Sequence, residues 1–420
     1  QLTTPAALKI TAGILILIGL VPGMPHLMFL ASGIALGVYA YSNDRAAERA
    51  ADAEEADSKI QEKPEDTDLD WEDIEHVDPI GLEIGYGLIP LVSESDGGVL
   101  LARIRGVRKK LSAELGFLIQ AIRIRDNLDI DPMTYNIVIK GAVRGSGTIR
   151  MGSELAINPG DVRTQLEGIP TKEPAFGLDA YWINPSQSDF AKTAGYTIVD
   201  GATVIATHIN AILRDNASDL LGHDETREIL DKIAQRSPKL IDDLVPDKLS
   251  VSTIMQILKN ILFESIPIRD MNTIIDTLLL ESSRTQNPDE LTALVRPRLG
   301  RLMLQNLVPP GEELSVITLD PALEQMLIGS LQQSKQAGEL IIEPKLVEGL
   351  IASVNQQRLQ AEENGFPAVL VVAPPIRPWL ARLLKQRFAE VSVLAYTEIP
   401  EDQNIKVFAR VGLEQNEEAA

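Results

Sequence analysis

Two apolar runs at the start of the chain constrain its fold more than any other feature. The first covers Ala6–Val21 and the second covers Met24–Tyr41, with Pro22-Gly23 between them. A helix needs about 20 apolar residues to cross the ~30 Å core of a bilayer, and about 17 is the lower limit. Backbone polar groups at that depth must be hydrogen-bonded within a helix, so two helices joined by a tight turn satisfy them. The pattern predicts a transmembrane helical hairpin over residues 1–42.

Charged residues near the hairpin predict which side of the membrane its ends face. Lys9 lies near the start of the first run, Arg45 and Arg49 follow the second, and the turn carries no lysine or arginine. Positive residues favour the cytoplasmic side, so both ends are expected in the cytoplasm. Gln1 is not an initiator methionine and the chain opens directly on a span, so further sequence is expected upstream. A buried helical hairpin in a soluble protein is the alternative.

An acidic segment, residues 43–78, follows the hairpin. It holds 15 acidic and 4 basic residues, a net charge of −11, which is about half of the −21 of the whole chain. Lys63–Asp73 has almost no apolar residues, so we expect a linker that is ordered only by a partner. Trp71 is the exception. A lone aromatic residue in such a tether is typical of an anchor that docks elsewhere, and a solvated or locally packed Trp71 is the alternative.

Composition excludes several classes of function. Phosphate binding requires a basic stripe, so nucleic acid is not expected as a partner. The absence of cysteine excludes disulfides, thiolate metal sites and cysteine nucleophiles, and fits a reducing cytoplasm. Apolar residues make up 45% of the chain but aromatic residues only 4%, so we expect large, mainly aliphatic cores.

The remaining pattern predicts an α+β multidomain protein. Residues 152–200 are rich in proline, glycine and aromatic residues without a helical period, and a helical pattern returns at Ala202–Leu213. This return suggests that a small β-rich unit is inserted into an α/β domain. The expected parts after the hairpin are the acidic linker, 43–78; a first α/β subdomain, 79–151 with 201–221; the inserted β-rich subdomain, 152–200; a helical subdomain, 222–308; a C-terminal α/β subdomain, 309–400; and a C-terminal strand and tail, 401–420.

Local patterns predict individual elements within these parts. Turn residues, capping residues and apolar spacing mark where each begins or ends. Ser250 is predicted to cap a helix and Asp270 to start the next one, and Asn287-Pro288-Asp289-Glu290 is typical of a further helix start. The expected strands are Leu100–Ile104, Ala121–Ile124, Tyr135–Val143, Ala368–Val372 and Val391–Ala395, and the expected helices include Arg108–Ile119, Val251–Phe263, Met271–Leu280 and Arg377–Phe388. The last two strands flank the helix at Arg377–Phe388, which predicts a parallel pair with a right-handed crossover. Gly145-Ser146-Gly147 is predicted to form a hairpin turn.

Catalytic and cofactor motifs do not emerge from the sequence. There is no phosphate-binding GxxxxGK[ST] loop, and Gly145-Ser146-Gly147 lacks the following helix of a dinucleotide site. The four histidines lack metal-ligand spacing. His208 and Asp215 are placed too loosely to suggest a catalytic triad, so His208 is predicted to be structural or on the surface. We therefore expect no enzyme activity, no metal and no cofactor.

A recognition site is the alternative to catalysis. Glu173-Pro174-Ala175-Phe176-Gly177 places an aromatic residue beside an acid within a rigid proline–glycine frame. Aromatic residues held on such loops suit partner capture. The alternative is that Phe176 and Trp182 form the core of the small unit.

Several ordered motifs together resemble the export-gate family of type III protein secretion, and its flagellar members in particular. The resemblance covers nearly the whole chain. Its motifs are His76–Tyr86 with Leu88-Ile89-Pro90, Ile124-Arg125-Asp126-Asn127, Leu155–Gly160, Pro174–Leu178 and Ala206-Thr207-His208.

This resemblance implies a function. Family members are components of the bacterial inner membrane, and several more spans would precede this chain. Their cytoplasmic part comprises a linker and four subdomains, and nine copies form a homo-oligomeric ring beneath the secretion channel. The ring receives export chaperone–substrate complexes and lies near the other membrane components of the gate and the export ATPase complex.

The resemblance also implies two sets of site residues. Glu173, Phe176 and Thr207 match family positions that line a chaperone-binding cleft between the first two subdomains, and Val199 is expected in the same cleft. Asp68, Trp71 and Asp73 match linker residues that dock on a neighbouring subunit. The leading hypothesis is thus a non-enzymatic export gate. The runner-up is a membrane-tethered signalling or enzymatic protein that acts on a small molecule, which would need a deep polar pocket with titratable groups.

Overall fold

The computed structural model describes residues 11–14, 17, 28, 31–38, 77–93, 98–160, 162, 164–337, 342–388 and 390–412. The chain divides into two compact units, Gln1–His76 and Val77–Ala420. Most of the predicted hairpin and the linker residues Asp68, Trp71 and Asp73 lie outside the described residues. Within the described residues, no helix has both the length and the apolar character needed to cross a bilayer.

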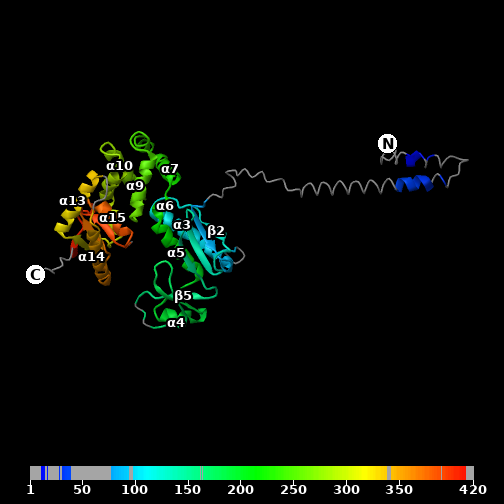
Figure 1. The fold of residues 1–420 in the computed structure, drawn as a ribbon, viewed down its shortest axis with the longest axis horizontal. Coiled ribbons are helices and arrows are strands. Elements are labelled where there is room, and N and C mark those ends of the chain that lie inside the picture. Colours follow the sequence, from blue (N-terminus) through cyan, green and yellow to red (C-terminus); the bar gives the residue numbers. More distant parts are fainter. Residues whose placement is uncertain are drawn as a thin grey trace. The chain divides into compact units, whose positions relative to one another are not determined.

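The first sheet of the larger unit, which contains the strand labelled β2 in Figure 1, has the strand order β2-β1-β3-β4. Its strands are β1 (Ile80–Ile84), β2 (Arg123–Asp126), β3 (Thr134–Ile139) and β4 (Ala142–Thr148). Strands β1 and β2 are parallel, and the other neighbours are antiparallel. The short 3-10 helix η2 (Tyr86–Leu91) follows β1. Helices α3 (Val99–Leu115) and α5 (Gly201–Asp215) pack against each other.

Three expectations for this region are wrong. Leu100–Ile104 begins helix α3 rather than a strand, because Leu100, Ile104, Leu111 and Leu115 recur at helical spacing and are all buried. Tyr135–Val143 contains the end of one strand and the start of the next, joined by a turn at Lys140-Gly141, where both residues have positive φ. Gly145-Ser146-Gly147 lies within β4 and not in a turn.

The chain forms a second, smaller sheet between β4 and α5. Its strands are β5 (Glu154–Ile157), β6 (Ile169–Lys172), β7 (Asp179–Ile183) and β8 (Thr197–Val199), in the antiparallel order β6-β7-β5-β8. A 3-10 turn η4 (Pro185–Gln187) and the short helix α4 (Ser188–Thr193) connect β7 to β8. The sequence did not indicate α4. Ala156, Leu166, Ile183, Ala191 and Tyr196 form a small core of their own.

Helices follow α5 without an intervening strand. They are α6 (Ala217–Leu220), α7 (His223–Ala234), α8 (Pro238–Asp242), α9 (Val251–Phe263), α10 (Met271–Glu281), α11 (Pro288–Val295), the 3-10 turn η5 (Arg296–Leu299) and α12 (Gly300–Gln305). Ser250, Asp270 and Asn287 cap α9, α10 and α11 with their side chains, as the sequence predicts. Pro297 lies in η5, where the helix is interrupted.

The C-terminal sheet is parallel throughout and has the order β11-β10-β9-β12. It comprises β9 (Leu314–Leu319), β10 (Val369–Val372), β11 (Ser392–Ala395) and β12 (Ile405–Val411), with helices α13 (Pro321–Ala337), α14 (Pro344–Glu363) and α15 (Arg377–Lys385) and the 3-10 turn η6 (Tyr396–Glu398). The predicted parallel pairing of the strands on either side of α15 is confirmed. Strand β9 was not predicted.

Candidate functional site: an exposed aromatic loop and a buried Tyr–His pair

Phe176 lies at the tip of the β6–β7 hairpin and leaves 68% of its surface exposed. The other aromatic residue considered for the core of this unit, Trp182, is buried. The hairpin register closes at Lys172 opposite Asp179, and these two side chains form an ion pair of 2.7 Å. The aromatic ring therefore stands on a short loop whose two ends are fixed by a strand pair.

Backbone geometry stiffens this loop. The Glu173 N–H donates to the Leu178 carbonyl at 2.8 Å, and the Gly177 N–H donates to the Glu173 carbonyl at 2.9 Å. Gly177 has a φ of +71°, a left-handed conformation that glycine adopts without steric cost. Pro174 has a ring-restricted φ. The loop is thus preorganised, which reduces the conformational entropy that a bound partner would have to remove.

Glu173 is buried, unlike its neighbour Phe176, with 2% of its surface exposed. Its Oε1 accepts a hydrogen bond from the Ala175 N–H at 2.9 Å, and its Oε2 accepts one from the Phe176 N–H at 2.7 Å. The carboxylate therefore faces the backbone of its own loop rather than solvent.

Val199 and Thr207 lie on the segment that returns from the small sheet to the first one. Val199 ends β8, opposite Leu155 of β5, and Thr207 is on α5; both are half-buried. Asp200 caps α5 through the Thr203 N–H and forms a 2.6 Å ion pair with Arg103 of α3. The cap fixes where β8 ends and α5 begins.

His208, the residue after Thr207, forms a buried polar pair with Tyr135. The sequence did not indicate Tyr135 as its partner. The Tyr135 hydroxyl and His208 Nδ1 are 2.9 Å apart, and the two rings meet edge to face. Burial lowers the pKa of His208, and the nearby Glu173 carboxylate opposes this shift. Burial, and then the same carboxylate, raise the pKa of Tyr135. Glu173 therefore lies close enough to act electrostatically on residues of β3 and α5.

The two glycines of Gly145-Ser146-Gly147 make room for this pair. A Cβ on Gly145 would lie 2.8 Å from His208 Nε2, and a Cβ on Gly147 would lie 2.6 Å from the Tyr135 hydroxyl. Glycine inside a strand commonly marks a close approach by another group. The two glycines were therefore the sequence signal that could have indicated a close contact at this strand.

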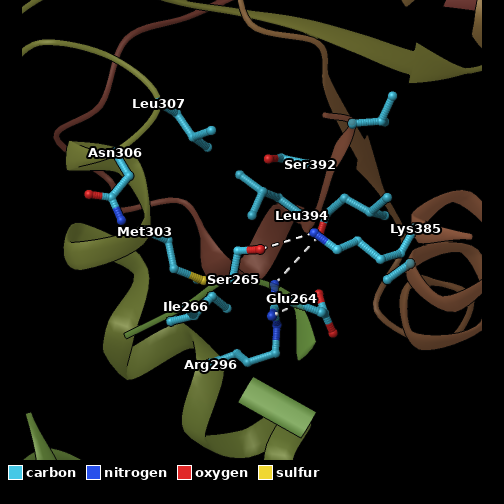
Figure 2. A pocket seen from close by; sticks show the side chains of 13 residues that line it. Glu264, Ser265, Ile266, Arg296, Met303, Asn306, Leu307, Lys385, Ser392 and Leu394 are labelled. Carbon is cyan, nitrogen blue, oxygen red and sulfur yellow. Dashed lines mark hydrogen bonds and ion pairs between the residues drawn. The ribbon is translucent and has the colours of Figure 1, made fainter. Parts of the chain in front are cut away.

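A cavity of about 160 Å³ lies between the helical segment, α6 to α12, and the C-terminal sheet (Figure 2). Its lining includes Arg296 and Glu264, and Lys385 Nζ donates to Ser265 Oγ across it at 3.0 Å. A small-molecule enzyme would need charged groups here that are available to a substrate.

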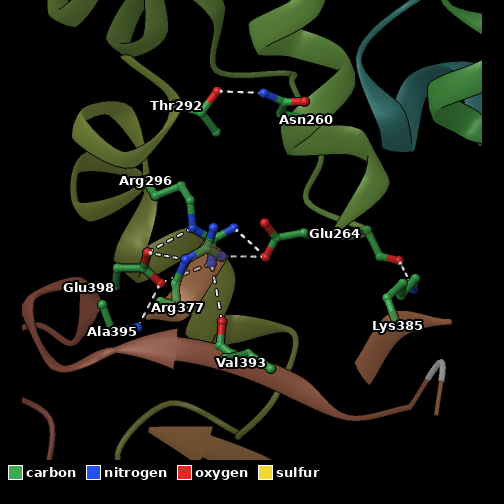
Figure 3. A network of polar contacts seen from close by, with 10 residues as sticks. Asn260, Glu264, Thr292, Arg296, Arg377, Lys385, Val393, Ala395 and Glu398 are labelled. Atoms are coloured by element: carbon green, nitrogen blue, oxygen red, sulfur yellow. Dashed lines mark hydrogen bonds and ion pairs between the residues drawn. The ribbon is translucent and has the colours of Figure 1, made fainter. Parts of the chain in front are cut away.

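The charges around this cavity are instead paired with one another (Figure 3). Arg296 contacts Glu398 at 2.7 Å and Glu264 at 3.0 Å, and Arg377 contacts both carboxylates. Burial alone would lower the pKa of Arg296, but the two carboxylates outweigh it and the net shift is upward. Among the described residues, no group of three or more His, Asp or Glu side chains could hold a metal. The pairing does not favour a small-molecule reaction at this cavity.

Comparison with known sequences identifies the family. The FHIPEP family model matches residues 1–404. The flagellar biosynthesis protein FlhA of Escherichia coli (strain K12) is 40% identical over 412 residues, which cover 98% of this chain and 58% of that protein. FlhA of Bacillus subtilis (strain 168) is 33% identical over 409 residues, which cover 96% of this chain and 59% of that protein. The chain thus spans less than two thirds of the length of these relatives.

Solved structures share the fold of the larger unit. The Chlamydia pneumoniae CdsV protein superimposes with a TM-score of 0.71 at 23% identity, over 81% of this chain and 99% of that one. The nonameric EscV cytosolic domain from the type III secretion system gives a TM-score of 0.64 at 20% identity, over 80% of this chain and 97% of that one. From the family match over residues 1–404 and the identity to FlhA proteins, the chain belongs to the FHIPEP family.

Proposed function

We propose that this chain is part of an export-gate component of the flagellar type III secretion apparatus, and that it docks export chaperone–substrate complexes. The observation that carries the proposal is Phe176, a large apolar side chain presented to solvent on a preorganised loop, in a chain that is 40% identical to a flagellar FlhA. A few anchor side chains, which are often aromatic, carry most of the binding energy of a protein interface.

The proposed docking cleft is formed by Phe176, Val199 and Thr207 between the first subdomain and the inserted one. The subdomain boundaries given above remain part of the proposal. Three observations support it: the chain has one sheet before residue 150 and another within 152–200, it returns through α5, and part of the small sheet packs in a small core of its own. Leu155, Ala180 and Trp182 of the same sheet pack in the main core.

Anchoring in the bacterial inner membrane by the hairpin is also proposed. In the described part of the first unit, Ala12 and Gly33 are buried, whereas Ile14, Ile34 and Val38 are exposed. A water-soluble hairpin would instead bury such large apolar side chains. The observed arrangement suits helices that pack through small residues and turn their large apolar side chains toward lipid.

Assembly into a homo-oligomeric ring is the third part of the proposal. Two relatives by fold, EPEC SctV-C and the EscV cytosolic domain, are nonameric. CdsV has been solved in a complex with CdsO, which supports proposing that this chain also binds a second protein. Contacts with the export ATPase complex and with the other gate components are proposed from the family resemblance. Asp68, Trp71 and Asp73 would join neighbouring subunits by docking the acidic linker of one copy on the next.

Replacing the exposed ring tests the docking site. In the full chain, Phe176→Ala should weaken binding of a purified filament-type chaperone–substrate complex by about tenfold or more. The variant lacks the aromatic ring that the complex would bury. Isothermal titration calorimetry measures the affinity. Phe190→Ala, which removes another exposed aromatic side chain from the same small unit, is the matched control and should bind normally. Equal affinity of Phe176→Ala and the wild type would refute the cleft assignment.

Replacing the linker aromatic tests the ring. Trp71→Ala should reduce the fraction of oligomers formed by the full chain in lipid nanodiscs, as counted by mass photometry. Binding of the chaperone complex to single subunits should not change, since Trp71 is proposed to contact a neighbour rather than cargo. Ring formation equal to that of the wild type would count against the linker assignment.

A further inference from the structure

Glu173 organises the whole tip of the β6–β7 hairpin. Its backbone N–H and carbonyl close the loop on Leu178 and Gly177, and its two carboxylate oxygens take the N–H groups of Ala175 and Phe176. Hydrogen bonds to a charged acceptor are stronger than those between neutral groups. Both main-chain N–H groups at the tip are thereby satisfied without a partner.

The position of the Glu173 side chain makes direct contact with a partner difficult. Only 2% of the residue is exposed, and the carboxylate acts electrostatically on Tyr135 and His208, which are themselves buried. A chaperone group could reach it only by displacing the loop. Phe176, in contrast, has most of its surface in solvent.

We propose that Glu173 is a positioning residue, which acts on a docked chaperone complex only through the orientation of Phe176 that it fixes. This inference rests on the proposed docking function. It assigns different tasks to two neighbours that the family resemblance groups together as cleft residues: Phe176 contacts the partner, and Glu173 holds Phe176 in place.

The chemistry of the carboxylate separates two conservative variants. Glu173→Gln keeps the size but offers one acceptor oxygen and turns an NH2 group toward a backbone N–H, so one of the two hydrogen bonds is lost. Glu173→Asp keeps the charge and both acceptors, and aspartate readily accepts from a backbone N–H two residues on. Asp should therefore maintain the loop, whereas Gln should loosen it.

Hydrogen–deuterium exchange tests the positioning directly and needs no partner. In the full chain in lipid nanodiscs, exchange of a peptide covering residues 173–178 should be about tenfold faster or more in Glu173→Gln, since a bond to a charged acceptor is lost. Glu173→Asp should stay within about threefold of the wild type, because both bonds remain. Peptides from β9 and β10 report whether the variants are folded elsewhere. Unchanged exchange in Glu173→Gln, or equally fast exchange in both variants, would overturn the proposal.

A double-mutant cycle then tests how Glu173 affects binding. Affinity for a filament-type chaperone–substrate complex is measured for Glu173→Gln, Phe176→Ala and the double variant. If Glu173 acts through Phe176, Glu173→Gln weakens binding in the wild-type background and has no further effect in Phe176→Ala. Additive losses would show a direct contact and overturn the inference. Normal binding by Phe176→Ala would instead refute the proposed docking function. The exchange experiment would still decide whether Glu173 holds the loop, because it needs no partner.

Discussion

Arg296 and Glu398 form a two-pronged ion pair in the interior of the protein. Arg296 Nε donates to Glu398 Oε1 at 2.7 Å, and Nη2 donates to Oε2 at 2.9 Å. The two residues belong to η5 and η6, and their side chains are 1% and 3% exposed. Glu398 also accepts from the Ala395 N–H at 3.2 Å. The pair fastens the end of the helical segment to the C-terminal sheet (Figure 3).

Glu398→Gln should destabilise the protein by ~3–5 kcal/mol, because Arg296 would keep its charge in the interior with only Glu264 left as a carboxylate partner. Urea unfolding of the full chain followed by circular dichroism measures the loss.

Asp402→Asn is the matched control for this variant. It removes the carboxylate of an exposed pair with Arg301, and such surface pairs contribute ~0–1 kcal/mol. Similar losses in the two variants would show that burial does not determine the strength of the Arg296 pair.

Gly145→Ala should destabilise the protein by ~1–3 kcal/mol, which is typical of overpacking a well-packed core. The added Cβ would lie 2.8 Å from His208 Nε2 and 3.1 Å from Ile212 Cδ1. Ser146→Ala, at the exposed position between the two glycines, should change stability by less than ~0.5 kcal/mol. Thermal unfolding of both variants checks the difference, and a neutral Gly145→Ala would contradict the close packing described here.

His208 should make stability depend on pH below neutrality. Burial lowers its pKa from the ordinary value of 6.5, so between these two values the unfolded chain binds more protons than the folded one. Stability is therefore full above pH 6.5, falls as the pH drops through 6.5, and levels off below the folded pKa. His208→Gln should flatten this decline. Urea midpoints from pH 8 to pH 5 measure it, and identical slopes in the variant and the wild type would exclude His208 as the cause.

Gly177→Ala should distort the loop that carries Phe176. No heavy atom lies within 4 Å of the added Cβ, so the cost arises from the φ of +71° alone, about 1–2 kcal/mol for an L-residue. The expected result is weaker binding of the chaperone complex without global unfolding. Gly106→Ala, also in open space but inside α3 with an ordinary φ, is the control and should slightly stabilise the helix.

Helix boundaries in the middle of the chain could be predicted closely because their causes are local. Val251–Phe263 was predicted to the residue, since Ser250 caps it and its apolar spacing is helical. The start of α11 followed from Asn287-Pro288 in the same way. Strand β9 was missed because six residues of mixed burial carry little periodicity, and their partners β10 and β12 are distant in the sequence.

The candidate site likewise contains one residue that a local signal predicted and one whose burial the sequence did not indicate. The sequence indicated Phe176 because an aromatic residue between Pro174 and Gly177 is a local signal. It gave no indication that Glu173 would turn inward. The burial of its carboxylate is a tertiary feature: the carboxylate acts electrostatically on Tyr135 of β3 and His208 of α5, which are distant in the sequence.

The sequence by itself determined the family, the helical segment and its caps, and the exposed-loop motif, because each of these depends on residue types at short, fixed spacing. Only the tertiary structure decided that Gly145 and Gly147 make room for a buried Tyr–His pair, that Glu173 is buried, and that Arg296 joins Glu398. Burial and side-chain pairing depend on which distant segments meet, and short-range patterns do not encode those meetings.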